Sequence, residues 1–441
     1  MQEHLVVDSQ PHIKNSLSSF FKRNFNTNLL TLSLIIAFFL SLPIYLYSLS
    51  ENFFIQIINF IFIFLGFLLF INQKHSFFLT GFFIGIFWFW WISLSFRYYN
   101  LTWLIPFVIF LIGIGYGIIF WGLNKIFTFF KFSIFNFSLS VYLWALFIIF
   151  GFDYIRPFTF DWLKPEVLLA TTFLLPTKLM LFIFIFSILL INISLKYKKI
   201  FRGLGFFSLI LGIILLQKPQ IPMPNLKINL ISTYIPQNKK WNKNYIPIEI
   251  NNNFKYIQTS IKKHYDVVVL PESAFPLFLN LHPFLMLKLL NLSKKITIVT
   301  GALHYKNKKF YNSTYIFENG KVKILDKHVL VPFGEYIPFP FFQKEINKIF
   351  FNGASDYKTS KKFGIFKIKN YKFINAICYE ATIEKLYTLK PHYIIAMSNM
   401  AWFMPSIAPI IQKLLIKVYA IKYKKIVFHS LNGYKSYIIK G

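Results

Sequence analysis

The sequence predicts a polytopic α-helical membrane domain followed by an α/β domain that lies outside the cytoplasm. Hydrophobic residues make up 56% of the chain and charged residues only 15%, whereas globular proteins have about 25% charged residues. Long uncharged runs fill the first half of the chain, and lysines concentrate in the second half. Between the two halves, residues 218–224 form a proline-rich linker, which is typical of a domain boundary.

The first half contains seven apolar runs that we expect to cross a bilayer, for which about 20 apolar residues are needed. They occupy residues 29–48, 52–72, 77–96, 104–123, 133–151, 179–195 and 201–217, and the last two are the shortest. Lysine and arginine lie in the N-terminal tail 1–28 and in alternate loops, which indicates a cytoplasmic N-terminus. With seven spans, the membrane domain 29–217 then places residues 225–441 outside the cytoplasm.

The formal net charge of +32 is typical of a nucleic-acid partner, but codon usage explains it better. Only four of the 48 basic residues are arginine, and Lys, Asn, Ile, Phe and Tyr are all abundant. A+T-rich codons encode this set, so we expect no nucleic-acid partner, although the charge still favours anionic lipid headgroups. The single cysteine, Cys378, permits no internal disulfide.

The second half alternates short β-type runs with helical stretches, as an α/β domain of this size does. Runs rich in Ile, Val, Tyr and Phe occupy residues 226–234, 266–270, 295–302, 310–317, 363–369, 372–378, 392–398 and 426–431. Helices are expected at residues 245–264, 281–293 and 406–422.

Three residues in this half form a possible nucleophilic set: Glu272, Lys327 and Cys378. A thiol is a strong nucleophile only as a thiolate, so it needs a base for its proton and a cation for its charge. Each residue also has an ordinary interpretation. A lone cysteine is often a small buried hydrophobe, a glutamate at a strand end is an ordinary loop carboxylate, and one lysine among dozens is usually solvated.

The motifs around these residues add a family resemblance. Pro271-Glu272-Ser273-Ala274, Thr300-Gly301-Ala302 and Tyr311-Asn312-Ser313 resemble the nitrilase (carbon–nitrogen hydrolase) superfamily. Other motifs are similar to one branch, the apolipoprotein N-acyltransferases: the run from Asp326 to Pro338, Ile377-Cys378-Tyr379-Glu380, Ser398-Asn399-Met400-Ala401-Trp402-Phe403, Ile235-Pro236-Gln237 followed by Trp241, and, loosely, Asp153-Tyr154-Ile155-Arg156.

The resemblance implies a nitrilase-like α-β-β-α sandwich carried on the membrane helices. It implies transfer of an acyl chain from a membrane phospholipid to the N-terminal amine of diacylglyceryl-cysteine apolipoproteins, through a cysteine thioester and without metal or cofactor. It also implies a multi-pass protein of the inner (plasma) membrane with its catalytic domain on the periplasmic side. We expect a monomer whose partners are the bilayer, the phospholipid donor and the lipoprotein acceptors.

The resemblance also assigns roles. Glu272 is the general base, Lys327 stabilises the oxyanion together with a backbone N–H near Tyr379, and Cys378 is the nucleophile. Glu335, Tyr379, Glu380 and Asn312 belong to the active site, and Trp241 lies on a loop that governs substrate access. The ordinary alternatives are that Glu335 caps a turn after Gly334, that Trp241 is a surface aromatic residue, and that Asp153 and Arg156 form only an interfacial ion pair.

The aromatic run 337–342, with Phe350 and Phe351, is predicted to be a membrane-dipping lid, because an enzyme that takes acyl chains from a bilayer needs an apolar path. The alternative is the general excess of phenylalanine in this chain.

Two departures from the branch leave other functions open. Met400 and Met404 stand where the branch has Asp and Gly, and the resemblance implies more outer domain and a final membrane helix beyond Gly441. We therefore expect a protein that is either reduced but functional or decaying. The alternatives are a membrane-bound amidase of the nitrilase type and a catalytically impaired membrane scaffold.

Overall fold

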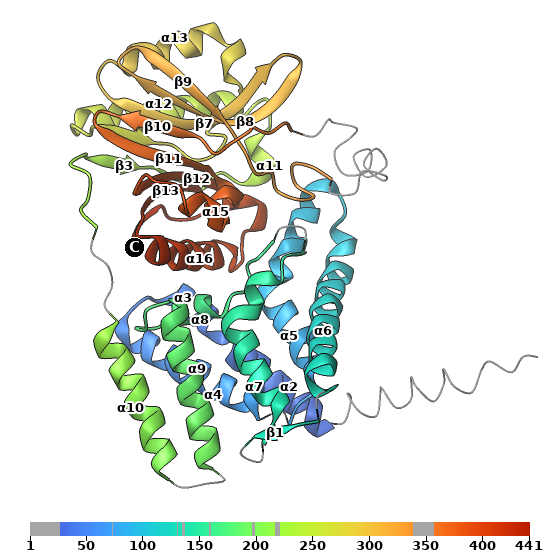
Figure 1. Cartoon of the computed structure of the whole chain (residues 1–441). Coiled ribbons are helices and arrows are strands. Elements are labelled where there is room, and N and C mark those ends of the chain that lie inside the picture. The colour runs from blue at the N-terminus through green and yellow to red at the C-terminus, as the bar shows by residue number, and fades with distance from the viewer. Residues whose placement is uncertain are drawn as a thin grey trace, which may run out of the picture.

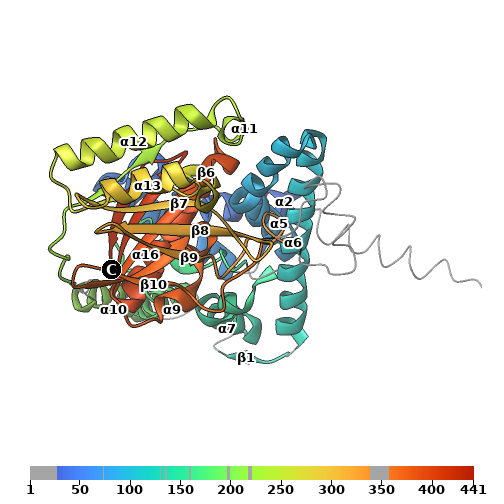
Figure 2. The ribbon, with the colours of Figure 1, turned by 90° about the horizontal axis from the view of Figure 1, so that it is seen from above.

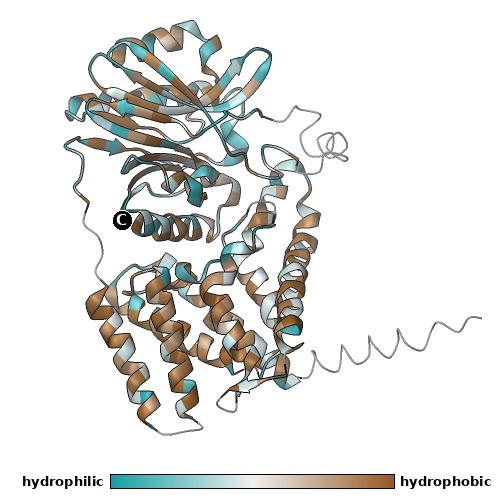
Figure 3. Ribbon diagram, in the orientation of Figure 1, coloured by the Kyte–Doolittle hydropathy of each residue, from teal (hydrophilic) through white to brown (hydrophobic). Residues whose placement is uncertain are grey.

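The computed structural model describes residues 27–72, 74–129, 131–134, 137–157, 160–195, 199–216, 221–337 and 357–441. Apolar helices form one part, and an α/β domain stacks on one end of it (Figure 1). Most of the ribbon of the helical part has the colour of hydrophobic residues, whereas hydrophilic residues are frequent along the ribbon of the α/β domain (Figure 3). This two-part architecture confirms the predicted fold class.

Four helices in the described residues are long and apolar enough to cross a membrane. They span Thr27–Leu49 (α2, Thr27–Phe39, with α3, Leu42–Leu49), Phe53–Ile71 (α4), Phe77–Tyr99 (α5, Phe77–Phe89, then a 3-10 helix, Trp90–Tyr99) and Thr102–Phe129 (containing α6, Ile105–Phe129). They coincide with the first four predicted spans.

The other three predicted spans appear as shorter apolar helices, so the count of seven stays a prediction. They are Leu139–Tyr154 (beginning with α7, Leu139–Leu146), α9 (Lys178–Ser194) and α10 (Ile200–Leu215). The fifth begins later than predicted, because β1 (Ser133–Ile134) and β2 (Phe137–Ser138) pair as a small antiparallel ribbon. The helix then begins after Ser138, whose side chain accepts the N–H of Ser140 as an N-cap.

The α/β domain contains two six-stranded sheets. The first has the order β3-β5-β7-β8-β9, with β6 pairing β7; its strands are β3 (Ile228–Leu230), β5 (Val267–Val269), β6 (Phe275–Phe278), β7 (Thr297–Lys306), β8 (Lys309–Glu318) and β9 (Lys321–Asp326). The second has the order β10-β11-β12-β13-β14, with β4 pairing β13; its strands are β4 (Ser232–Thr233), β10 (Ile365–Ile368), β11 (Tyr371–Ile377), β12 (Tyr393–Asn399), β13 (Ile426–Asn432) and β14 (Tyr437–Lys440).

All eight predicted β-type runs coincide with strands, and the run 226–234 divides into β3 and β4. Sequence reasoning missed β6, β9 and β14. The strand β6 contains Pro276, which weakens a strand prediction. The strands β9 and β14 lie at sheet edges and carry lysines, as edge strands often do. In β9 the charged residues obscure the strand pattern, and β14 is only four residues long.

One apolar layer lies between the two sheets, and a second lies between the first sheet and its covering helices. Val267, Val269 and Val299 of the first sheet pack against Phe373 and Ile395 of the second. The alternate residue Val268 faces outward and packs with Phe254 and Leu289, which lie on α12 (Ile246–Lys262) and α13 (Pro283–Leu292). Both helices cover the outer face of the first sheet (Figure 2). These layers confirm the expected α-β-β-α sandwich.

The helix α16 (Ala408–Tyr423) covers the second sheet and separates it from the membrane helices (Figure 1). It is buried on both sides: Leu414 belongs to one apolar cluster that includes Ile394 of β12 and Ile44 of α3. Lys417 Nζ donates to the carbonyl of Ala170 at 2.7 Å, and Lys413 pairs with Glu51. The α/β domain and the membrane helices therefore share one hydrophobic core.

Candidate active site

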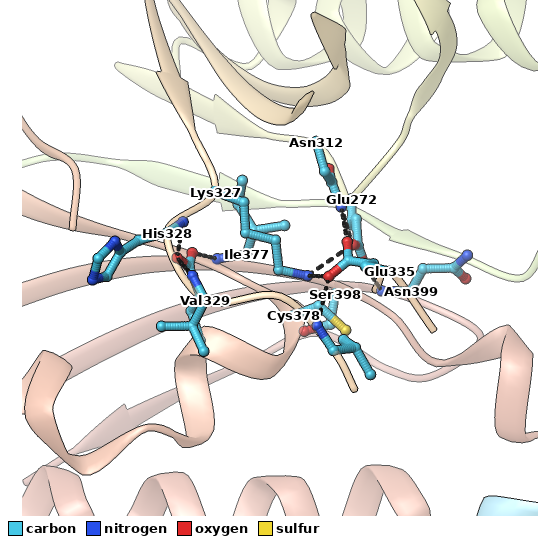
Figure 4. Close-up of polar contacts among 12 residues, drawn as sticks. Glu272, Asn312, Lys327, His328, Val329, Glu335, Ile377, Cys378, Ser398 and Asn399 are labelled. Atoms are coloured by element: carbon cyan, nitrogen blue, oxygen red, sulfur yellow. Dashed lines mark hydrogen bonds and ion pairs between the residues drawn. The ribbon is translucent and has the colours of Figure 1, made fainter. Parts of the chain in front are cut away.

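The three residues of the predicted nucleophilic set each follow a strand. Glu272 comes soon after β5, Lys327 directly after β9, and Cys378 directly after β11. The parallel neighbours β11 and β12 end at the same edge of their sheet, so Asn399 at the end of β12 lies beside the cysteine. Figure 4 shows Glu272, Lys327, Cys378 and Asn399 converging at this edge.

Glu272 is a buried carboxylate held from two sides. Its Oε1 accepts a hydrogen bond from Asn312 Nδ2 at 2.8 Å, and its Oε2 accepts the backbone N–H of Asn399 at 2.8 Å. Lys327 Nζ lies 4.0 Å from Oε1. Burial raises the pKa of Glu272, and the charge of Lys327 works in the opposite direction. A carboxyl group with a raised pKa is a better proton acceptor than an exposed one.

Lys327 is completely buried and is paired with two carboxylates. Its Nζ lies 2.7 Å from Glu335 Oε2, in addition to the longer contact with Glu272. Burial alone lowers the pKa of a lysine, but the charges of Glu335 and Glu272 outweigh this effect and raise the pKa of Lys327. The side chain therefore remains an ammonium ion throughout the range in which proteins are stable.

Glu335 is fixed by the same residues. Asn312 Nδ2 donates to its Oε1 at 2.9 Å, so one amide bridges Glu335 and Glu272. The N–H of Val331 donates to its Oε2 at 2.9 Å, which is the turn-capping contact expected as the alternative. The same carboxylate thus accepts from the turn and pairs with Lys327, and its role in the active site stays a prediction.

Cys378 has a left-handed backbone conformation with φ of +53°, which is costly for a residue with a Cβ. Its thiol is free. Burial raises the pKa of the thiol, the negative charge of Glu272 raises it further, and the charge of Lys327 and the N–H of Asn399 oppose these effects. The raised pKa favours the protonated thiol at rest, so a nucleophilic role would need a neighbouring group to take its proton.

Glu380 lies behind the cluster and accepts hydrogen bonds from the segments that carry Lys327 and Cys378. Its Oε1 accepts the N–H groups of His328 at 2.7 Å and Val329 at 3.1 Å, and its Oε2 accepts the N–H of Ile377 at 2.8 Å. These N–H groups directly follow Lys327 and directly precede Cys378. The neighbouring ring of Tyr379 is buried and stacks on Phe160 of the helical part, with a centroid distance of 6.3 Å.

Sequence reasoning missed Asn399 and the amide network around it. Asn399 Nδ2 donates to Gln237 Oε1 at 2.7 Å, and Asn399 Oδ1 accepts from Asn432 Nδ2 at 2.8 Å. Asn432 Oδ1 in turn accepts from Thr233 Oγ1 at 2.8 Å. All four side chains are buried, so the network fixes the N–H that faces Glu272 and Cys378. The sequence signals were the position of Asn399 after a predicted strand and its place in the motif Ser398–Phe403, but neither assigned it a contact.

Trp241 stands apart from this cluster. It follows α11 (Gln237–Lys240), is 41% exposed, and takes no part in the hydrogen-bonded cluster formed by the described residues. Its segment is nevertheless attached to the site through Gln237. The predicted lid lies outside the described residues, apart from Ile337 at its start. Met400 is buried in a 3-10 helix, Met400–Phe403, directly after Asn399.

In the described residues, the carboxylate of Asp153 pairs with two lysines, whereas the alternative considered was an ion pair with Arg156. Lys164 Nζ lies 2.8 Å and Lys178 Nζ 3.0 Å from the carboxylate of Asp153, while Arg156 Nε donates to its backbone carbonyl. The carboxylate is thus paired with lysines from later segments, which the short motif did not contain.

A surface groove of about 990 Å³ lies apart from the cluster around Cys378, none of whose residues lines it. It lies between the edge strands β9 and β10. Its lysines are Lys321, Lys323, Lys367, Lys372 and Lys390. Lysines on edge strands oppose pairing with other chains, which explains them without a ligand.

Gly301 on β7 is expected to be essential for the position of Glu272. A Cβ at Gly301 would lie 2.5 Å from the backbone N of Ser273 and 2.8 Å from the Cα of Glu272. We expect Gly301→Ala to destabilise the protein by about 1–3 kcal/mol. If Cys378 is acylated as the resemblance implies, the substitution should reduce that rate about 100-fold, since misplacing a catalytic group by about 1 Å has this effect.

Thermal unfolding in detergent and acyl-enzyme formation measure the two effects of Gly301→Ala. The matched control is Gly115→Ala in α6, where a Cβ meets nothing within 4 Å. Wild-type acylation in Gly301→Ala would show that the Glu272 loop relaxes without functional cost.

A sandwich with Glu272, Lys327 and Cys378 at its strand ends, joined to membrane helices, defines the class as a membrane-embedded carbon–nitrogen hydrolase fold. Residues 248–427 match the carbon–nitrogen hydrolase family. Residues 27–215 match the integral membrane domain of apolipoprotein N-acyltransferase.

The apolipoprotein N-acyltransferase of Wolinella succinogenes is 39% identical over 370 residues, which are 83% of this chain and 85% of that protein. The apolipoprotein N-acyltransferase of Campylobacter jejuni is 37% identical over 431 residues, 96% of this chain and 92% of that protein. The corresponding protein of Helicobacter pylori is 37% identical over 83% of this chain and 84% of its own length. The chain belongs to the apolipoprotein N-acyltransferase family.

Proposed function

We propose that this protein transfers a fatty acyl chain from a membrane phospholipid to the N-terminal amine of diacylglyceryl-cysteine apolipoproteins, through a thioester on Cys378. One observation carries the proposal. A buried base, Glu272, and a buried ammonium ion, Lys327, face the thiol of Cys378 in a domain that shares its core with membrane helices. The names of the relatives support the choice of substrates.

In the first half-reaction Glu272 takes the thiol proton and Sγ of Cys378 attacks the carbonyl carbon of a phospholipid ester. The C–S bond forms, the ester C–O bond breaks, and the leaving alkoxide of the lysophospholipid takes the proton from Glu272. The product is an acyl-enzyme, which divides one difficult transfer into two easier steps.

In the second half-reaction the amine of the lipoprotein attacks the thioester. Glu272, again a carboxylate, takes a proton from the amine as the C–N bond forms. The C–S bond breaks, and the sulfur of Cys378 recovers a proton from Glu272. The acceptor leaves as an amide and the enzyme returns to its starting state, so the two half-reactions balance without an added reductant or nucleotide.

Both half-reactions pass through a tetrahedral oxyanion, and we propose that Lys327 stabilises it. The ammonium ion is completely buried and is held by Glu335 at 2.7 Å, so it needs little reorganisation as charge develops. A backbone N–H near Tyr379 is proposed as the second donor. Glu380 and Asn312 position these groups, and Trp241 governs access as part of the segment attached through Gln237.

We further propose that the protein lies in the inner membrane with its catalytic domain on the periplasmic side, where lipoprotein substrates are exposed. The lysines in alternate loops support this orientation.

Mass spectrometry of the intact protein tests the proposal. Incubation with vesicles of phospholipids that carry a labelled palmitoyl chain is expected to leave one hydroxylamine-labile acyl group on Cys378. Adding a diacylglyceryl-cysteine peptide should remove the label from the enzyme and transfer it to the peptide amine. Cys378→Ser is the control and should remain unlabelled. An enzyme that forms the adduct but transfers the acyl chain only to water is an amidase-type hydrolase, and absence of any adduct indicates a scaffold.

A further inference from the structure

Arg97 is unusual for this chain, in which only four of 48 basic residues are arginine. It lies near the end of the 3-10 helix Trp90–Tyr99, which continues α5 within the candidate span Phe77–Tyr99 of the membrane domain. Because lysine predominates so strongly in this chain, an arginine indicates a role that needs a guanidinium. Such a group donates several hydrogen bonds in a fixed planar arrangement, which an ammonium ion cannot do.

The guanidinium of Arg97 binds two backbone carbonyls at once. Nε donates to Leu94 of its own helix at 3.1 Å, and Nη2 donates to Met404 of the catalytic domain at 2.7 Å. The next residue adds a parallel contact, since Tyr98 Oη donates to the carbonyl of Ala401 at 3.1 Å. The two acceptors outside the helix, Met404 and Ala401, both belong to the segment 401–404.

Aromatic rings reinforce the same contact. Trp402 meets Tyr98 edge to face, with centroids 5.4 Å apart, and stacks on Tyr99 at 6.0 Å. Phe403 meets Trp91, which is buried in the membrane domain, at 5.0 Å. The 3-10 helix Trp90–Tyr99 therefore holds the segment 401–404 along its whole length.

The held segment begins two residues after Asn399, whose backbone N–H donates to Glu272 and faces the thiol of Cys378. The link between them is short and structured. Asn399 Oδ1 accepts the N–H of Ala401 at 3.3 Å, and Met400 between them is buried. A shift of segment 401–404 would therefore displace the N–H of Asn399.

We propose that Arg97 and Tyr98 are positioning residues of the active site, through which the membrane domain holds the 399–404 segment in its catalytic position. The membrane helices then do more than anchor the enzyme: they complete its active site. The inference goes beyond the proposed function, because it concerns the reactivity of Cys378 toward any electrophile.

Two readouts test the role of Arg97. In acyl-enzyme formation from labelled phospholipid, Arg97→Ala is expected to lose about 100-fold in rate. Arg97→Lys should recover part of this, because one ammonium ion can reach Met404 but cannot also bind Leu94. Tyr98→Phe, which keeps the ring against Trp402 and loses only the hydroxyl contact, should lose about tenfold.

The second readout is the rate of Cys378 alkylation by iodoacetamide as a function of pH. The N–H of Asn399 lowers the pKa of both Glu272 and Cys378, so its displacement should move the profile of Arg97→Ala to higher pH. The other charged groups that face these two residues are Lys327, Glu335 and, toward Glu272, Lys240. None of them contacts Arg97, so the substitution leaves them in place.

The matched control is Arg202→Ala. Arg202 lies near the start of α10 in the same domain and contacts Ser194 at the end of α9, away from the segment 401–404. It should change neither readout. A purely structural role of Arg97 would lower the unfolding temperature in detergent without moving the pH profile, and this result would overturn the proposal. A wild-type enzyme that forms no acyl adduct would contradict the proposed function, while the alkylation experiment would still decide the role of Arg97.

Discussion

Replacing Glu272 by glutamine should reduce the rate of acyl-enzyme formation by about 10³-fold, the middle of the range for loss of a general base. Burial keeps the pKa of the Cys378 thiol well above neutral pH, so the thiol reacts only when a neighbouring group takes its proton. Glutamine preserves the hydrogen bonds from Asn312 and Asn399 in part, but it accepts no proton. Stopped-flow measurement of acylation with a labelled short-chain phospholipid would determine the effect.

The same substitution separates two roles of Glu272, because they predict effects of opposite sign. The negative charge of Glu272 raises the pKa of Cys378, so a carboxylate that acted only through its charge would suppress the thiolate. Its removal would then accelerate acylation. An increase in rate in Glu272→Gln would therefore contradict the role of general base.

A pH profile of the wild-type enzyme gives a further check on Glu272. Its pKa is raised by burial, and the base is active only as a carboxylate. As the pH falls, acylation should therefore decline at a higher pH than the usual titration range of an exposed glutamate, about 4.3. In Glu272→Gln this acid limb should disappear from the residual activity.

Replacing Lys327 by methionine should reduce acylation by about 10²–10³-fold, because the oxyanion loses its buried positive charge. It should also destabilise the protein by about 3–5 kcal/mol, the usual result of removing one partner of a buried ion pair. The reason is that the carboxylates of Glu272 and Glu335 then remain buried without a counter-charge. Acylation kinetics and thermal unfolding in detergent measure the two effects independently.

A double variant distinguishes lost catalysis from lost stability at Lys327. In Lys327→Met with Glu335→Gln, one uncompensated charge is removed and the amide contact from Asn312 to residue 335 is retained in part. The unfolding temperature should recover, whereas the acylation rate should stay low. Recovery of both would indicate that Lys327 only maintains the structure around Cys378.

Local patterns in the sequence were sufficient for much of the architecture. The apolar runs, the β-type runs and the three helical stretches of the outer domain correspond to observed elements, because helix and strand periodicity reflect which face is buried. Edge strands such as β9 escaped this reasoning, since a strand with one solvated edge need not be apolar. The interruption at β1 and β2 also escaped it, because the flanking residues are as apolar as those of the helix.

The sequence by itself was sufficient to predict which residues take part in the chemistry, because the motifs around Glu272, Lys327 and Cys378 are contiguous and specific. Only the tertiary structure decided how these residues are supported. The carboxylate of Glu380 joins segments 50 or so residues apart, and Arg97 reaches the carbonyl of Met404 across 307 positions of the chain. Such contacts depend on how sheets and helices pack. Packing also brings the backbone N–H of Asn399 close to both Glu272 and Cys378, and no local sequence pattern predicts this position.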